Sequence, residues 1–210
     1  KTFSYIIGGR VDYHNRLGVF MTPRLHVRYN PWDLGVFRFS VGRGKRAANI
    51  FAENQQYFGS SRQFVIQNSG GKLYGLDPEI AWNYGVSFTQ KFRLFNKNSE
   101  VTLDVYRTDF QNQVVVDVMQ NAQQVLFYNL QGRSYANSVQ LDFNIEPIHK
   151  LNIRNSFKYY DLATDYQSGR YQRPLQPRYR FFSNVEYETK TTDKNRFWKM
   201  DVTYNWLGKQ

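Results

Sequence analysis

The stretch Trp198-Lys-Met-Asp-Val-Thr-Tyr-Asn-Trp206 decides the fold class, because large apolar side chains alternate in it with polar ones. Successive side chains of a β-strand point to opposite faces of the sheet, so this period of two predicts a strand with one apolar and one polar face. The segment from Val139 to Glu146 alternates in the same way. Both segments therefore predict a sheet with two unlike faces.

The alternation recurs along nearly the whole chain and predicts about nine strands. The other seven are expected around residues 3–13, 24–29, 37–41, 82–94, 101–105, 151–159 and 181–187. No segment of comparable length has a 3.6-residue apolar stripe, so the fold class is all-β, an antiparallel meander.

Short and long connections alternate between these strands. Short turns rich in Pro, Asn and Asp are expected near residues 30–34, 96–99, 147–150 and 190–195. Long polar stretches fill residues 45–78, 110–134 and 161–176. The second of these is expected to contain strand extensions at 114–118 and 125–128. Short turns at one end and long loops at the other are typical of outer-membrane barrels.

Composition narrows the classes of protein. The chain has 210 residues, 18% of them aromatic, a formal net charge of +11 and no cysteine. Without cysteine there is no disulfide framework, zinc ribbon or thiol nucleophile. No run approaches about 18 apolar residues, which excludes a membrane-spanning helix, and no signal peptide is visible.

A soluble β-sandwich is the main alternative, because its strands alternate too. It would be a carbohydrate-binding module that uses loop aromatics such as Tyr57, Phe58 and Tyr74. Long strands, aromatic residues near the ends of the apolar faces and long loops at every second connection favour a membrane barrel. In lipid every backbone polar group needs an internal partner, which a closed barrel supplies.

Several short motifs, in order and spacing, resemble TonB-dependent receptors of the Bacteroidetes type. They are Met21-Thr-Pro-Arg-Leu-His-Val-Arg-Tyr-Asn-Pro31, Gly42-Arg-Gly-Lys-Arg-Ala-Ala-Asn49, Glu53-Asn54 with Ser60-Ser61-Arg62, Leu76-Asp-Pro-Glu-Ile-Ala-Trp-Asn-Tyr-Gly85, Tyr106-Arg-Thr-Asp-Phe-Gln-Asn-Gln-Val-Val-Val-Asp117, and Phe127-Tyr-Asn-Leu130 followed by Ser134 to Gln140. The set spans most of the chain from residue 21 onward. The family pattern often has Trp where Lys45 stands.

The resemblance implies a transmembrane barrel of about 22 strands, of which residues 1–210 form one segment. The plug domain and the closing C-terminal strands are expected to be absent from this segment. The implied function is import of a large scarce solute, such as an iron chelate, cobalamin, an oligosaccharide or a peptide. The implied partners are outer-membrane lipid, the TonB complex through the plug region, the solute and a surface lipoprotein.

Ligand-binding residues are expected at the top of one strand and in the loop that follows it. Arg43, Arg46, Asn49 and Glu53 either face the upper lumen and touch the solute, or pair with one another and with loop backbone. Polar members of the inward face are further candidates, namely Arg38, Asn83 and Lys91.

Other chemistries have weaker support. The run from Gly42 to Arg46 lacks the Ser or Thr and the following helix that a phosphate-binding loop needs. The chain's histidines have no second ligand at metal-binding spacing, so neither a metal nor a cofactor is expected. No catalytic constellation is visible, and an enzyme is not expected. Basic residues spread over all strands instead of clustering, which argues against a nucleic-acid partner.

Overall fold

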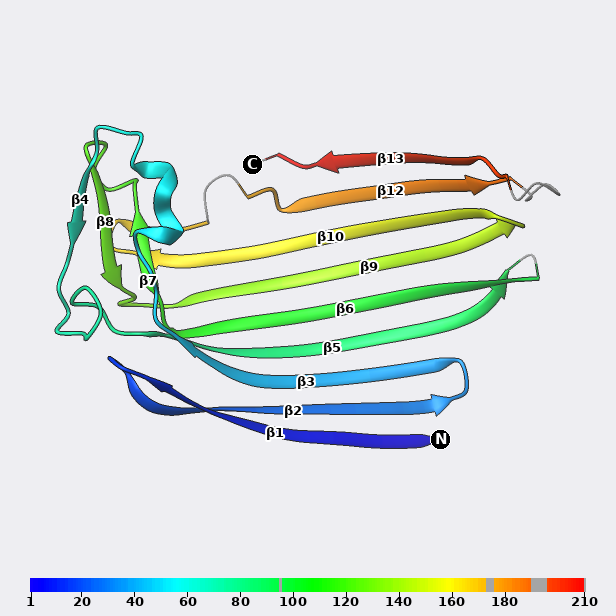
Figure 1. Cartoon of the computed structure of the whole chain (residues 1–210), viewed down its shortest axis with the longest axis horizontal. Helices are drawn as coiled ribbons and strands as arrows, with labels where there is room; N and C mark the ends of the chain where they lie inside the picture. The colour runs from blue at the N-terminus through cyan, green and yellow to red at the C-terminus, as the bar shows by residue number, and fades with distance from the viewer. Residues whose placement is uncertain (95, 173–175, 190–195, 210) are drawn as a thin grey trace.

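The computed structural model describes residues 1–94, 96–172, 176–189 and 196–209. Nine long strands form one antiparallel path in the order β1-β2-β3-β5-β6-β9-β10-β12-β13 (Figure 1). Their bounds are β1 Thr2–His14, β2 Gly18–Trp32, β3 Gly35–Arg46, β5 Glu79–Leu94, β6 Lys97–Asn112, β9 Ser134–Ile148, β10 Leu151–Tyr166, β12 Tyr179–Glu188 and β13 Lys199–Leu207. The predicted all-β meander is confirmed.

Tight turns close one end of this sheet. Asp33 and Leu34 link β2 to β3, and His149 and Lys150 link β9 to β10. Asn96 and Lys150 adopt positive φ angles of 58° and 67°, which a tight reversal demands and Asn tolerates best. The turn predicted at residues 190–195 lies outside the described residues.

Cross-strand partners share a face, so the pairing register sorts the side chains into two faces. We call the face that carries Arg38 and Asn83 the inner face, and the opposite one the outer face. Val105, for example, pairs with Val86 and Val139 on the outer face, while Asp104 pairs with Ser87 and Gln140 on the inner face. The predicted division into apolar and polar faces is therefore present.

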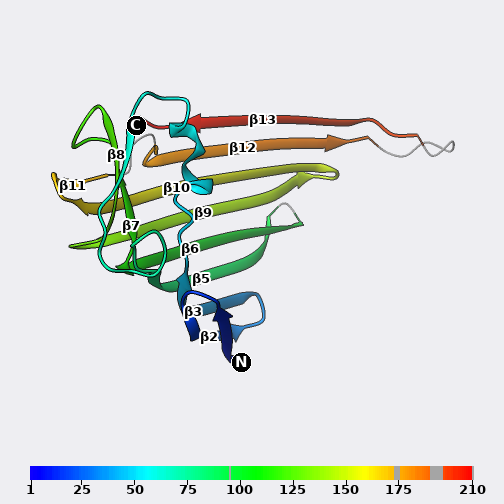
Figure 2. The ribbon, with the colours of Figure 1, turned by 60° about the vertical axis from the view of Figure 1, so that its left-hand side comes forward.

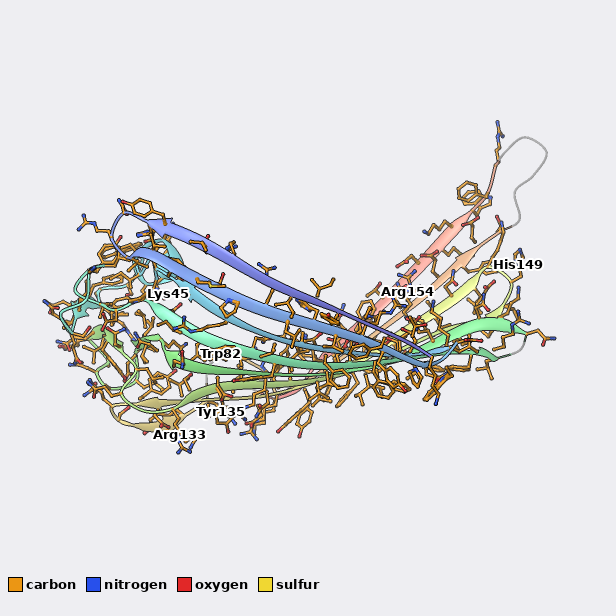
Figure 3. All side chains as sticks on the ribbon, turned by 90° about the horizontal axis from the view of Figure 1, so that it is seen from below. Lys45, Trp82, Arg133, Tyr135, His149 and Arg154 are labelled. Atoms are coloured by element: carbon orange, nitrogen blue, oxygen red, sulfur yellow. The ribbon has the colours of Figure 1, made fainter. Side chains whose placement is uncertain are left out.

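The outer face has no second layer packed against it in the described part of the chain. Leu141 and Val105, at the centre of the sheet, stay 45% and 43% exposed. In water, each apolar side chain left exposed forgoes about 25 cal/mol per Å² of burial. A soluble β-sandwich would bury this face against another sheet, so the sandwich alternative is not favoured. Figure 3 shows the sheet as a single bowed layer.

The long loops at the other end build a small structure of their own. A second sheet has the order β4-β8-β7, from β4 Gln63–Ile66, β8 Gln124–Asn129 and β7 Val114–Asp117. We call it the loop sheet. The short 3-10 helix η1 Ala52–Tyr57 lies beside it, and β11 Gly169–Tyr171 pairs with the end of β10. Figures 1 and 2 show these segments gathered at one end of the main sheet. Among the described residues, no helix is long and apolar enough to cross a membrane.

The most deeply buried apolar side chains of the described residues lie in the loop sheet and in the loop segments packed against it. Ile50, Leu76, Val125 and Phe127 form one buried cluster, and Val115, Leu126 and Tyr128 form another on the opposite face. Burial on both faces explains the continuous apolar runs in β7 and β8. The strands expected at 114–118 and 125–128 are present, but they form this separate sheet instead of extending the long strands.

Candidate functional site

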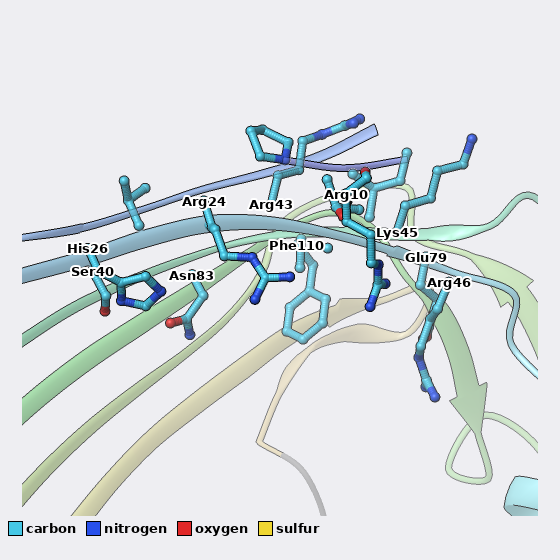
Figure 4. Close-up of a pocket in the computed structure, with 17 residues that line it drawn as sticks. Arg10, Arg24, His26, Ser40, Arg43, Lys45, Arg46, Glu79, Asn83 and Phe110 are labelled. Atoms are coloured by element: carbon cyan, nitrogen blue, oxygen red, sulfur yellow. Dashed lines mark hydrogen bonds and ion pairs between the residues drawn. The ribbon is translucent and has the colours of Figure 1, made fainter. Parts of the chain in front are cut away.

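A cavity of about 470 Å³ lies on the inner face, at the end of the sheet that carries the long loops. Its polar and aromatic lining includes Arg10, Arg24, His26, Arg46, Asn83 and Phe110. These residues come from strands β1, β2, β3, β5 and β6. Figure 4 shows their side chains from adjacent strands. We call it the upper cavity.

Arg24 occupies the middle of this site because its neighbours are small. It pairs with Gly8 on β1 and with Gly42 on β3. A Cβ atom at Gly8 would lie 2.9 Å from Cγ of Arg24, so glycine there lets the arginine stem cross the strand. Within the described part of the chain, the Arg24 guanidinium has no hydrogen-bond or ion-pair partner. An unpaired guanidinium in a cavity is suited to bind an anionic group.

Arg46 is held in a charged network at the edge of the cavity. Its Nη1 and Nη2 donate to the two carboxylate oxygens of Glu53 at 3.1 and 2.9 Å, and its Nε donates to Oε2 of Glu79 at 2.6 Å. The Asn49 backbone N–H also donates to Glu53, at 3.1 Å. Burial lowers the pKa of Arg46, but Glu79 and Glu53 together raise it, so the net shift is upward. Three of the predicted residues are therefore brought together, and they pair with one another.

Arg43 is among the residues that line the upper cavity, but it does not join this charged network. It pairs across strands with Trp82, which places it on the outer face, three residues from Arg46 and on the other side of the sheet. In Figure 4 its side chain points away from those of Arg24 and Phe110. Its Nε donates to the side-chain oxygen of Gln111 at 3.4 Å. Alternation along β3 places these two predicted residues on opposite faces.

The other predicted residues lie on the inner face at different heights. Asn83 lines the upper cavity and donates to Oγ1 of Thr108 at 2.8 Å. Arg38 lies lower and donates to Oγ1 of Thr89 at 3.3 Å. Lys91 lies near the turns, in a separate cavity of about 670 Å³. We call that one the lower cavity.

Sequence reasoning missed most of the residues that line the upper cavity, among them Arg10, Arg24, His26, Lys45, Glu79 and Phe110. Arg24 and His26 follow the polar period of their strand, so alternation assigns them to the inner face. The sequence does not give the pairing register between strands, and it is this register that places Arg24 and His26 at the same height on the inner face as Asn83. Glu79 stands where a long loop re-enters the sheet, a position at which a carboxylate can meet Arg46 of the preceding strand.

A largely buried hydrogen-bond network fixes the loop sheet to Gln167, the residue that follows β10. Tyr128 Oη donates to Oδ2 of Asp117 at 3.1 Å and accepts from the Gln167 backbone N–H at 3.0 Å. Asp117 Oδ1 accepts from the backbone N–H groups of Met119 and Gln120. The pairing of Gln67 with Gln167 adds a second link between the loop sheet and the end of β10. The loops at this end are therefore tied together.

Within the described residues, no group of three or more His, Cys, Asp or Glu side chains is placed to hold a metal ion. The site chemistry is that of arginine guanidinium groups, amides and aromatic rings.

A one-layer sheet with an apolar outer face, a polar inner face and structured loops at one end defines a wall segment of a large transmembrane β-barrel. Trp82 and Tyr135, labelled in Figure 3, lie toward the loop end of the outer face, where aromatic girdles meet the membrane surface.

Comparison with known proteins identifies the family. Residues 1–210 match the family model described as TonB dependent receptor-like, beta-barrel, and the chain belongs to that family. Family membership places the protein in the bacterial outer membrane. None of the curated proteins matches the chain.

Solved receptors share the fold at low sequence identity. The ferric enterobactin receptor PfeA of Pseudomonas aeruginosa is similar with a TM-score of 0.67 and 14% identity, over 98% of this chain and 30% of that chain. The siderophore receptor PirA of Pseudomonas aeruginosa is similar with a TM-score of 0.57 and 15% identity, over 97% of this chain and 38% of that chain. PirA of Acinetobacter baumannii is similar with a TM-score of 0.58 and 15% identity, over 91% of this chain and 29% of that chain. The chain therefore spans well under half the length of these receptors.

Proposed function

We propose that the protein to which this chain belongs imports a large scarce solute across the outer membrane, driven through TonB. The observation that carries the proposal is the family match over residues 1–210. The upper cavity supports it, because it opens on the inner face beside the structured loops, where a solute would arrive from outside. We propose that residues 1–210 are one segment of a single barrel domain, with the plug and closing strands elsewhere in the protein.

Among an iron chelate, cobalamin, an oligosaccharide and a peptide, an iron chelate has the most support. PfeA is a ferric enterobactin receptor and both PirA proteins are siderophore receptors. The upper cavity adds an unpaired guanidinium and the ring of Phe110, which suit an anionic chelate with planar groups. We propose Arg24, Asn83 and Phe110 as residues that touch the solute, while Arg46, Asn49 and Glu53 hold the loop in place. Arg38 and Lys91 lie deeper along the same wall.

The remaining assignments complete the proposal. The protein is a receptor and transporter without enzymatic activity, and it belongs to the Bacteroidetes type of the family. Its partners are outer-membrane lipid, the TonB complex through a plug region, the imported solute and a surface lipoprotein. Nucleic acid is not among them, because the basic side chains are spread over the strands of a wall that faces a lumen and lipid.

The test is accumulation of iron chelates by cells of the source bacterium. Cells with and without the complete gene are grown under iron limitation, and uptake of a panel of iron-59 chelates is measured. The proposal predicts that at least one chelate accumulates only when the gene is present, and that dissipating the proton gradient abolishes uptake but leaves surface binding. Equal accumulation of every chelate in both strains, with cobalamin, oligosaccharide and peptide panels also unchanged, overturns it.

A further inference from the structure

An arginine lies on the outer face at the level where the apolar band begins. Arg107 on β6 is one step further from the loops than the row of cross-strand partners that contains Trp82 and Tyr135. The next step toward the turns is apolar, because Val105 pairs there with a valine on each neighbouring strand. Each step along one face of a strand is about 6.6 Å. A charge beside hydrocarbon is costly unless it has polar partners, so the contacts of Arg107 decide what this position can bind.

Arg107 is held by polar neighbours on the loop side. Its Nε and Nη2 donate to the two carboxylate oxygens of Asp109 at 2.8 and 2.6 Å, and its Nη1 donates to Oδ1 of Asn137 at 3.1 Å. The guanidinium also lies over the ring of Tyr135, 4.9 Å from its centre. The side chains of Arg107 and Asp109 nevertheless stay 47% and 42% exposed, so a ligand on the outer face can still reach them.

A second guanidinium, that of Arg43, reaches the same strand nearer the loops. Its Nε donates to the side-chain oxygen of Gln111 at 3.4 Å, and Gln111 is two residues beyond Asp109 on β6. Within the described residues, Arg43 has no carboxylate partner. The carboxylate of Asp161 on β10 is two strand spacings from β6, or about 10 Å, and accepts from a side-chain amide of β9 at 3.3 Å. Two guanidinium groups on β6 therefore share one carboxylate.

An apolar hollow extends from Arg107 toward the turns. It has a volume of about 340 Å³, lies on the outer face across β2, β3, β5 and β6, and has Tyr84 and Arg107 at its loop-side end. Its apolar lining includes Leu25, Val27, Phe39, Val41, Val86 and Val105. A second hollow of about 330 Å³ shares Leu25 and Val41 with it and is lined by Trp82, the cross-strand partner of Arg43. Two apolar hollows thus lie next to two guanidinium groups.

We propose that Arg43 and Arg107 bind the phosphate of an outer-leaflet lipid whose acyl chains lie in the two outer-face hollows. Guanidinium groups match phosphate oxygens in geometry, and the phosphate supplies the negative charge that Asp109 alone does not. The rings of Trp82 and Tyr84 lie where aromatic side chains meet lipid headgroups. A zwitterionic headgroup carries its own ammonium cation, so the site favours a lipid whose phosphate has no such partner.

This inference gives the proposed lipid partner a site and a chemical class. It rests on contact between the outer face and lipid, and it is independent of which solute is imported.

The test measures lipid binding to the complete receptor in a neutral detergent by native mass spectrometry. The probes are dimyristoyl phosphatidic acid, dimyristoyl phosphatidylcholine and dimyristoylglycerol, which share their acyl chains. The expected result is that phosphatidic acid binds about 10-fold more tightly than either of the others. Arg43→Gln/Arg107→Gln/Asp109→Asn removes both cations without leaving a carboxylate unpaired, and it should abolish this preference. Arg154→Gln, at an exposed position of the inner face, is the matched control and keeps it.

A second pair of variants tests the hollow separately from the charges. Val105→Trp fills the hollow, whereas Val139→Trp places the same ring on the cross-strand partner of Val105, which does not line it. Binding of phosphatidic acid should weaken several-fold in Val105→Trp and stay unchanged in Val139→Trp. Millimolar inorganic phosphate should not displace the lipid, because it lacks acyl chains. Folding of each variant is checked by resistance of the barrel to heat before electrophoresis.

Two results overturn the lipid site. One is a preference for phosphatidic acid that persists in the triple variant. The other is displacement of phosphatidic acid by inorganic phosphate together with unchanged binding in Val105→Trp, because the site then takes a free anion. A receptor that retains none of the three lipids contradicts the proposed lipid contact of the outer face as well, whereas one that retains all three equally contradicts this site alone.

Discussion

Arg46 at the end of β3 and Glu53 in η1 are joined by two parallel hydrogen bonds of 3.1 and 2.9 Å. The contact connects the rim of the barrel wall to the first turn of its longest described loop. Glu79, on the adjacent strand, holds the third nitrogen of the same guanidinium. A loop that begins at a strand end is thus fixed within a few residues of leaving the sheet.

Arg46→Gln is expected to loosen this loop without unfolding the barrel. The substitution leaves Glu53 and Glu79 without their cation, and because the Glu79 side chain is only 12% exposed, the cost is about 1–3 kcal/mol. Limited proteolysis of the complete receptor in outer-membrane vesicles should show several-fold faster cleavage near residues 50–62. Arg43→Gln, three residues away on the outer face, serves as the control. Equal cleavage rates in the two variants would contradict the network's role.

Arg24→Gln is expected to weaken solute capture, because it removes the unpaired guanidinium of the upper cavity. A charge-assisted hydrogen bond contributes about 1.5–3 kcal/mol, so binding should weaken roughly 10- to 100-fold. The measurement is the half-saturating concentration for cell-surface binding of whichever iron chelate the protein imports. Arg10 is already paired with Asp12 at 2.8 Å, so Arg10→Gln should have a smaller effect. A larger loss in Arg10→Gln would show that Arg24 is not the contact residue.

Tyr128→Phe is expected to loosen the link between the loop sheet and Gln167, the residue that follows β10. The hydroxyl joins Asp117 to the Gln167 backbone N–H, and its loss leaves that N–H without its acceptor. The local cost should be about 1–3 kcal/mol. Hydrogen exchange of the Gln167 amide should accelerate accordingly, while Tyr74→Phe, an exposed tyrosine of the same loop region, leaves it unchanged. Unaltered exchange in Tyr128→Phe would rule out this link.

The same tyrosine predicts instability of the loop sheet at high pH. Burial, assisted by the nearby Asp117 carboxylate, raises the pKa of Tyr128 to about 12, above the ordinary value near 10. The folded form holds the proton more tightly, so this stabilisation is complete below pH 10 and is lost as the pH rises toward 12. Protection of loop-sheet amides, corrected for intrinsic exchange, should fall over that interval. The fall should be absent in Tyr128→Phe.

The faces of the long strands were predictable from sequence, because alternation is a local property of the chain. The pattern of Val139 to Glu146 alone separates Leu141 from Asp142, and the structure confirms that Leu141 lies with Leu103 on the outer face and Asp142 with Thr102 on the inner face. The tight turns were also predictable, because the residues that favour a reversal lie within the turn itself. Asn96 and Lys150 adopt the positive φ angles of two of these turns.

The site was only partly predictable, because it depends on contacts between distant segments. Arg43 and Arg46 are neighbours in sequence, but β3 remains regular through both, so an odd spacing sends them to opposite faces. Phe64 lies parallel to Val125 in the loop sheet, a pairing of segments about 60 residues apart that no periodicity encodes. The cavity that contains Arg24 likewise depends on the register of five strands.

The most direct test of the membrane-barrel account compares arginine at two adjacent positions of β9. Leu141 is an outer-face residue and Gln140 an inner-face one. The free energy of unfolding of the complete receptor, refolded into phosphatidylcholine bilayers, should fall by about 2–4 kcal/mol in Leu141→Arg and by less than about 1 kcal/mol in Gln140→Arg. Equal losses in the two variants, or a receptor that folds fully in water without lipid or detergent, would contradict the claim that the outer face meets hydrocarbon.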